Sequence, residues 1–96
     1  MKTKIQKLLF SIHLLLLENE QQEWAKRFEL FSKQLDVDYK KTLLEIKGIF
    51  AGAGSFNDLV LHKKGEMLKS ENNELNMLQD KLYDVLKEEI LKIKSQ

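Results

Sequence analysis

The 96-residue chain contains no cysteine and no proline, and it has only four glycines. Without cysteine it can form no disulfide and offers no thiolate for metal binding or nucleophilic catalysis, which fits a reducing compartment. Because proline is absent and glycine is scarce, few residues interrupt helices. The length allows one hydrophobic core, so we expect a single helical domain over residues 1–96.

An excess of charge of one sign is also lacking. The Lys and Arg residues number 16 and the Asp and Glu residues 15, which gives a net charge of +1, and Arg27 is the one arginine. Domains that bind nucleic acid usually carry a basic patch and a far higher pI than the 7.9 of this chain. The pairs Lys40-Lys41 and Lys63-Lys64 are better explained as solvated lysines. We therefore expect no nucleic-acid partner.

The longest apolar run, residues 8–17, is too short to cross a membrane, which takes about 20 residues. Three lysines within residues 2–7 precede this run, as in a signal peptide. However, His13 lies inside it, and Glu18 begins a polar stretch with no small-residue cleavage pattern. The sequence predicts a cytoplasmic protein with no membrane partner.

Four segments place apolar residues at helical spacing. Along the chain they cover about residues 3–18, 20–35, 39–50 and 70–93. Asp36-Val37-Asp38 is a short link with a carboxylate that can cap the third helix, and Ser70 can cap the fourth. Short links make neighbouring helices antiparallel. The sequence thus predicts an all-α fold, a small four-helix bundle-like domain.

Aromatic side chains are expected at the centre of the core. Trp24, Phe28 and Phe31 lie at i, i+4 and i+7, a spacing that more often marks buried residues than a binding face. We expect this stripe to pack with apolar residues of the other helices. These are Leu8, Ile12, Leu15, Leu43, Ile46, Phe50, Leu75, Leu78 and Leu82.

The first helix is apolar on two sides. Besides the stripe that faces the core, Phe10, Leu14 and Leu17 form a second stripe on nearly the opposite side. One core surface cannot cover both, so the helix is either central in the bundle or offers its second stripe to a partner. We predict that Phe10, Leu14 and Leu17 form the interface of a homodimer.

Helical periodicity is lost between the third and fourth helices. Gly52 and Gly54 permit positive φ, and residues 55–58 (Ser-Phe-Asn-Asp) can start a helix or form a turn in which polar side chains bond backbone N–H groups. Residues 59–62 are β-prone, and Lys63-Lys64-Gly65 can turn them back as a small hairpin. We expect a Gly-rich loop, with a short β-hairpin as a further feature of this segment.

The sequence around this loop resembles a family of short bacterial proteins of unknown function. Their pattern reads W-A-x-x-F/L, then G-G-x-G-S-F/L-N-D-L, then a closing helix. In this chain Trp24-Ala25, Phe28 and residues 52–59 match the pattern, whereas Ala51 replaces the first of the paired glycines. The resemblance covers most of the chain and implies no particular activity.

No group of reactive side chains forms a complete catalytic or metal-binding motif. Gly52-x-Gly54 lacks the third glycine of a dinucleotide fingerprint. Ser55, Asp58 and His62 are the residue types of a hydrolytic triad, but the G-x-S-x-G elbow is absent. His62 and Glu66 are too few to bind zinc, and structural or surface roles explain His62 and His13 better. We predict no enzyme activity, no cofactor and no metal.

Two function classes stay open. We favour a protein-interaction module, of an immunity type or a regulatory kind, that works by occupying an unidentified protein partner. The alternative is a small-ligand-binding protein or enzyme that uses the loop of residues 52–58. Candidate binding residues in this loop are Gly52, Gly54, Ser55, Phe56, Asn57 and Asp58. A third interpretation assigns these residues to the turn alone, because demanding turns need the same residue types.

Overall fold

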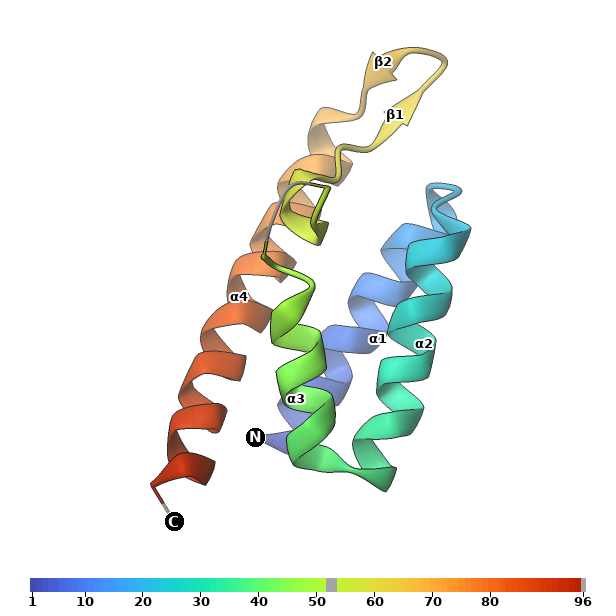
Figure 1. Cartoon of the computed structure of the whole chain (residues 1–96). Coiled ribbons are helices and arrows are strands. Elements are labelled where there is room, and N and C mark those ends of the chain that lie inside the picture. The colour runs from blue at the N-terminus through green and yellow to red at the C-terminus, as the bar shows by residue number, and fades with distance from the viewer. Residues whose placement is uncertain (52–53, 96) are drawn as a thin grey trace.

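A computed structural model describes residues 1–51 and 54–95 of the chain. In these residues the helices are α1 (Lys2–Glu18), α2 (Gln22–Val37), α3 (Tyr39–Gly48) and α4 (Lys69–Lys94). Successive helices run in opposite directions along an elongated body of 49 × 22 × 21 Å (Figure 1). Helices α1 and α3 each contact both α2 and α4. The predicted all-α, four-helix architecture is confirmed.

The turn between α1 and α2 closes without a glycine. The Gln21 N–H donates to the Leu16 carbonyl at 2.9 Å, and the Glu20 N–H donates to the Leu17 carbonyl at 3.3 Å. This pair of bonds is the Schellman motif, which places one residue in the left-handed region. That residue is Glu20, with φ of +62°, where glycine is favoured. The reversal of the chain therefore includes a strained residue.

Asp38 caps α3, as its position in the sequence predicted. Its Oδ1 atom accepts a bond of 3.2 Å from the Lys41 N–H. The helix ends at Gly48, two residues earlier than the spacing suggested, and the N–H of Phe50 donates instead to the Lys47 carbonyl in a tight turn. The periodicity continued to Phe50 because its ring still packs against the core from that turn.

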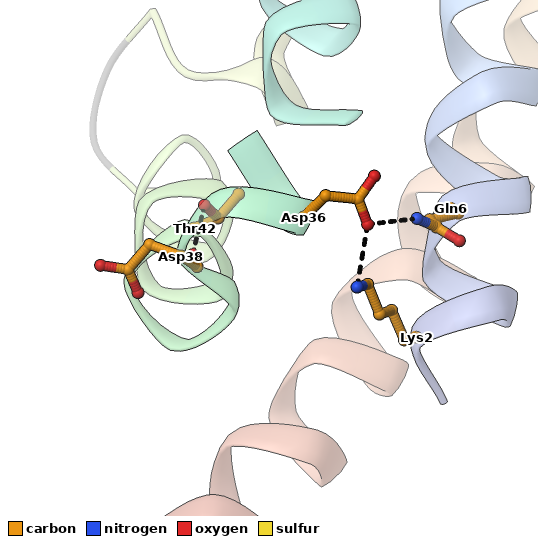
Figure 2. A network of polar contacts seen from close by, with 5 residues as sticks. All are labelled: Lys2, Gln6, Asp36, Asp38 and Thr42. Atoms are coloured by element: carbon orange, nitrogen blue, oxygen red, sulfur yellow. Dashed lines mark hydrogen bonds and ion pairs between the residues drawn. The ribbon is translucent and has the colours of Figure 1, made fainter. Parts of the chain in front are cut away.

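Polar contacts fasten the corner between α2 and α3 to the start of α1. The Lys2 Nζ atom lies 2.8 Å from Asp36 Oδ1, and Gln6 donates to the same oxygen at 3.3 Å. Figure 2 shows both contacts meeting at Asp36, next to the Thr42 hydroxyl, which donates to the Asp38 carbonyl at 2.7 Å. These contacts hold one end of the bundle together.

The core combines all four helices and the segment between α3 and α4. The predicted core residues are buried except Trp24 and Phe50, which are half-buried and pack against the core edge. Phe56 and Leu61, from the connecting segment, are fully buried as well. The loop therefore contributes to the core as well as linking two helices.

The described residues of the connection from α3 to α4 include a 3₁₀ turn, η1 (Phe56–Asp58), and a hairpin of β1 (His62–Lys63) and β2 (Glu66–Met67). His62 pairs with Met67 and Lys63 with Glu66 in antiparallel register. The two-residue turn has positive φ at both positions, Lys64 at 53° and Gly65 at 80°, as a type I′ turn requires. The predicted hairpin is confirmed, and it extends beyond the end of the bundle (Figure 1).

Asn72 of α4 holds the base of the hairpin. Its Oδ1 accepts from the Leu61 N–H at 2.8 Å, and its Nδ2 donates to the carbonyls of Leu61 and Leu68 at 2.9 and 2.8 Å. The prediction that Ser70 caps α4 is wrong, because the helix begins at Lys69 with Leu68 at the cap position and no side-chain cap. The docking of the hairpin onto Asn72 sets where α4 starts.

Candidate functional site

Phe56 is the centre of an aromatic cluster that joins the loop to α2. Its ring centroid lies 4.8 Å from that of Phe28, 5.1 Å from Trp24 and 5.7 Å from Phe50. The side chain is fully buried. Phe56 is one of the candidate binding residues of the loop, but its ring is not on the surface: it fills the core beside Phe28 of α2, as the interpretation of the loop as a structural turn requires.

Both backbone polar groups of Phe56 are also satisfied inside the protein. Its N–H donates to the Ile49 carbonyl at 2.9 Å, and its carbonyl accepts from the Gln79 side-chain amide at 2.8 Å. Gln79 lies on α4 and is itself buried. An unpaired backbone group in the core costs free energy, so this bond stabilises the path of the loop.

The other loop residues divide between structural and surface positions. Gly54 has φ of +72°, and its N–H donates to Asp58 Oδ2 at 2.9 Å. Asn57 is exposed and donates to the Phe50 carbonyl at 3.4 Å. Ser55 occupies the cap position of η1 without a side-chain bond to it, whereas the bond from the Gly54 N–H to Asp58 is of the kind expected for the alternative, a turn in which polar side chains bond backbone N–H groups. The predicted candidate Gly52 lies outside the described residues.

A groove of about 610 Å³ runs between α2 and α3 and ends at the loop. The residues from α2 include Trp24, Arg27 and Phe31, and those from α3 include Glu45 and Gly48. Among the predicted loop candidates, Gly54 and Ser55 line this groove. Since α2 and α3 are antiparallel (Figure 1), the beginning of α2 faces the end of α3, where Gly54 and Ser55 complete the lining of the groove.

Arg27 provides the positive charge of the groove. Its guanidinium carbon lies 4.5 Å from the centre of the Trp24 ring, a cation–π contact that orients the arginine. Neither of the ion pairs between described residues involves Arg27. No motif of the sequence marks Arg27 as a site residue, although its position three residues after Trp24 places both on one helical face.

A second hollow, of about 470 Å³, lies on the other side of the loop. It is lined by Asn57 and by residues of α4 that include Asp80, Tyr83 and Asp84. The structure thus separates the candidate residues: Gly54 and Ser55 belong to the groove at α2, and Asn57 belongs to the hollow at α4. They do not form a single site.

The two histidines bond to backbone carbonyls. His13 Nδ1 lies 2.8 Å from the Ala25 oxygen, so this nitrogen carries the proton, and the contact ties α1 to α2. His62 Nδ1 lies 3.1 Å from the Val60 oxygen on the exposed hairpin. The structural and surface roles predicted for these residues are confirmed. Because Asp58 bonds Gly54 and His62 bonds Val60, neither side chain is directed at Ser55 by a hydrogen bond.

Tyr39, at the end of the bundle opposite the loop, has a shifted pKa. The Tyr39 hydroxyl donates to Glu89 Oε2 at 2.5 Å, which links α3 to α4. Burial, together with the hydrogen bond and the negative charge of Glu89, raises the pKa of Tyr39 well above its usual value. Lys2 lies 5.9 Å from the centre of the same ring. The contact between Tyr39 and Glu89 links α3 to α4, and neither Tyr39 nor Glu89 lines the groove.

The second apolar stripe of α1 lies on the surface of the chain. Phe10 is 59% exposed, Leu14 39% and Leu17 51%. The other side of α1 is fully engaged in the core through residues such as Ile5, Leu9 and Ile12. The bundle therefore leaves one face of α1 without apolar cover.

In residues 1–51 and 54–95, no helix has both the length and the apolarity needed to cross a bilayer. Nor do three or more His, Asp or Glu side chains in this part of the chain gather as a metal-binding group. The described structure thus offers the groove, the hollow and the α1 stripe as its candidate binding surfaces.

Comparison with known proteins identifies the family. A family model matches residues 17–69, more than half of the chain, and this range contains α2, α3, the hairpin and every residue that lines the groove. No curated protein and no solved structure matches the chain. The resemblance to a family of unknown function is thereby confirmed: the chain belongs to the family described as a domain of unknown function, DUF6966.

Proposed function

We propose that this protein is a non-catalytic interaction module, of an immunity type or a regulatory kind, and that it assembles as a homodimer through α1. The observation that carries the proposal is the exposure of Phe10, Leu14 and Leu17 on a helix whose opposite side is buried. These three residues lie at i, i+4 and i+7, so they form one continuous apolar stripe. Stripes of this kind on small proteins commonly mark interfaces.

A second copy of the chain is the simplest occupant of this stripe. A two-fold axis places the same surface of both copies in contact, so one apolar stripe covers another. The stripe carries no charged side chain of its own, and covering it would remove three large apolar side chains from water. The groove lies between α2 and α3, and its described lining includes no residue of α1. It would therefore stay available in the dimer for a further partner.

Sedimentation equilibrium of the full chain tests this proposal. We expect a dimer for the wild type and a monomer for Leu14→Glu, because a buried unpaired carboxylate at the centre of the stripe opposes association. Leu91→Glu is the matched control, since Leu91 is an exposed apolar residue of α4 outside the stripe, and it should remain dimeric. A monomeric wild type at millimolar concentration would contradict the homodimer.

One observation favours the alternative of a small-ligand-binding protein or enzyme. The groove volume falls in the range of small-molecule sites, and Gly54 and Ser55 of the predicted loop lie at its edge. Native mass spectrometry of the protein purified from its source cell separates the two functions. A tightly held small molecule supports the alternative, whereas a stoichiometric protein complex supports the interaction module.

A further inference from the structure

We propose that the groove between α2 and α3 binds a peptide segment of a partner protein, with an acidic side chain of that segment paired to Arg27. This inference rests on the proposed function as an interaction module, and it assigns the partner's chemistry at a surface separate from the α1 stripe. Three independent features of the groove support it: the arrangement of Arg27, the absence of a side chain at Gly48, and the distribution of charge over the apolar floor.

The first feature is the orientation of Arg27 by Trp24. The guanidinium carbon lies 4.5 Å from the centre of the indole ring, and neither ion pair of the described residues uses this arginine. A stacked guanidinium retains its planar set of N–H donors for a carboxylate, which it can bind in a bidentate manner. Tryptophan and arginine are also the residue types most enriched at the energetic centres of interfaces.

The second feature is a glycine that the fold does not require. Gly48 is the last residue of α3, and a Cβ built there meets no atom within 4 Å. In contrast to Gly54 and Gly65, its φ is not positive, so a side chain would be compatible with the backbone. Glycine in a helix reduces stability relative to alanine. The position of Gly48 on the wall of the groove explains why this residue is glycine, because a side chain there would occupy the space of the ligand.

The third feature is the polarity of the groove. The buried residues Phe31 and Ile49 are part of its lining, and the exposed Leu30 adds a further apolar surface. Glu45 lies about one turn before Gly48 on α3, so the groove carries a carboxylate as well as the Arg27 charge. A complementary segment therefore has an acidic residue for Arg27, an apolar residue for the floor and a basic residue for Glu45.

The groove is open to solvent between two helices, and its lining includes Gly54 and Ser55 of the loop, so it offers an extended surface that a length of polypeptide can follow. The segment need not displace the core, because the groove residues Phe31 and Ile49 are already packed in it. Trp24, the one tryptophan of the chain, is half-buried in the groove wall and reports binding directly through its fluorescence.

Selection from a displayed library of random twelve-residue peptides on the immobilised full chain tests this inference. The most enriched peptide is then synthesised and titrated into the protein while Trp24 fluorescence is recorded. We expect enriched peptides to combine acidic, apolar and basic residues, and Arg27→Gln to weaken binding by about tenfold or more. Lys26→Gln removes the same charge from the neighbouring exposed position outside the groove, and it should bind as the wild type does.

Gly48→Leu is the second test, because it adds a side chain on the groove wall at a position where a Cβ meets no atom within 4 Å. We expect it to abolish peptide binding while the melting temperature stays at or above that of the wild type, so loss of binding would not reflect unfolding. Equal peptide affinity in wild type, Arg27→Gln and Gly48→Leu would overturn the inference, as would failure to enrich any peptide. Binding that is lost in Leu14→Glu but kept in both groove variants would assign docking to the α1 stripe, which overturns the groove and leaves the proposed function standing.

Discussion

The side-chain amide of Gln79 donates a 2.8 Å hydrogen bond to the carbonyl of Phe56, and both residues are buried. This bond connects the middle of α4 to the loop at the point where the loop enters the core. It explains a polar side chain on the apolar face of α4, because the Gln79 amide gives the Phe56 carbonyl a second and shorter hydrogen bond beside the one from the Leu59 N–H at 3.2 Å. The loop is thus held in place by two contacts: the Phe56 ring packs in the core, and the Gln79 amide of α4 donates to the Phe56 carbonyl.

Gln79→Met should destabilise the protein by about 0.5–1.5 kcal/mol. Methionine retains much of the volume but removes the 2.8 Å hydrogen bond to the Phe56 carbonyl, which then keeps only the Leu59 N–H, at 3.2 Å, as a donor. Urea unfolding followed by circular dichroism measures the change. Lys81→Met, at an exposed position of the same helix, should change stability by less than about 0.5 kcal/mol. A value for Gln79→Met as small as that of the control would show that the bond is dispensable.

Phe56→Ala should cost about 3–5 kcal/mol, because it removes a fully buried ring from contact with Trp24, Phe28 and Phe50. Asn57→Ala should cost far less, since Asn57 is exposed and its bond to the Phe50 carbonyl is long. Chemical denaturation of both variants gives the comparison. Similar losses for the two would indicate that the polar turn, rather than the ring, holds the loop.

Glu20→Gly should stabilise the protein by about 0.5–1 kcal/mol. The left-handed conformation of Glu20 costs a non-glycine residue about 1–2 kcal/mol, and glycine removes this cost. Part of the gain is lost again, because glycine has more conformational freedom in the unfolded chain. Thermal unfolding measures the shift. Lys26→Gly, in the interior of α2, should instead lower stability by about 1 kcal/mol. A loss of stability in Glu20→Gly would mean that the Glu20 side chain makes a compensating contribution.

The Tyr39–Glu89 contact should make stability depend on alkaline pH. Because the pKa of Tyr39 is raised in the folded state, the unfolded chain loses this proton first, near pH 10. The stabilisation is fully present below that pH and declines as the pH rises toward the folded pKa. Unfolding of wild type and Tyr39→Phe between pH 8 and 11 tests this. Their difference in stability should shrink above about pH 10, and a constant difference would exclude the linkage.

Local patterns were sufficient to predict the helices, the Asp38 cap and the hairpin. Helical period, capping side chains and the Lys63-Lys64-Gly65 turn act between residues close in the chain, so the printed sequence carries them directly. The aromatic stripe of α2 was predicted on the same basis. The resemblance to the family could also be found in the sequence, because each of the two segments that carry it, Trp24-Ala25 and Gly54–Asp58, is continuous in the chain.

Tertiary structure decided which residues of the loop face inward and where a groove opens. Phe56 is buried because Phe28 and Gln79, distant in the chain, meet it there. The groove exists because the antiparallel packing of α2 and α3 brings Arg27 and Gly48 to one surface. No local pattern states which separate segments will meet, since that is set by the packing of the whole core. For this reason the sequence by itself determined the helices and their order, whereas only the folded chain separated the core residue Phe56 from the surface residues around it.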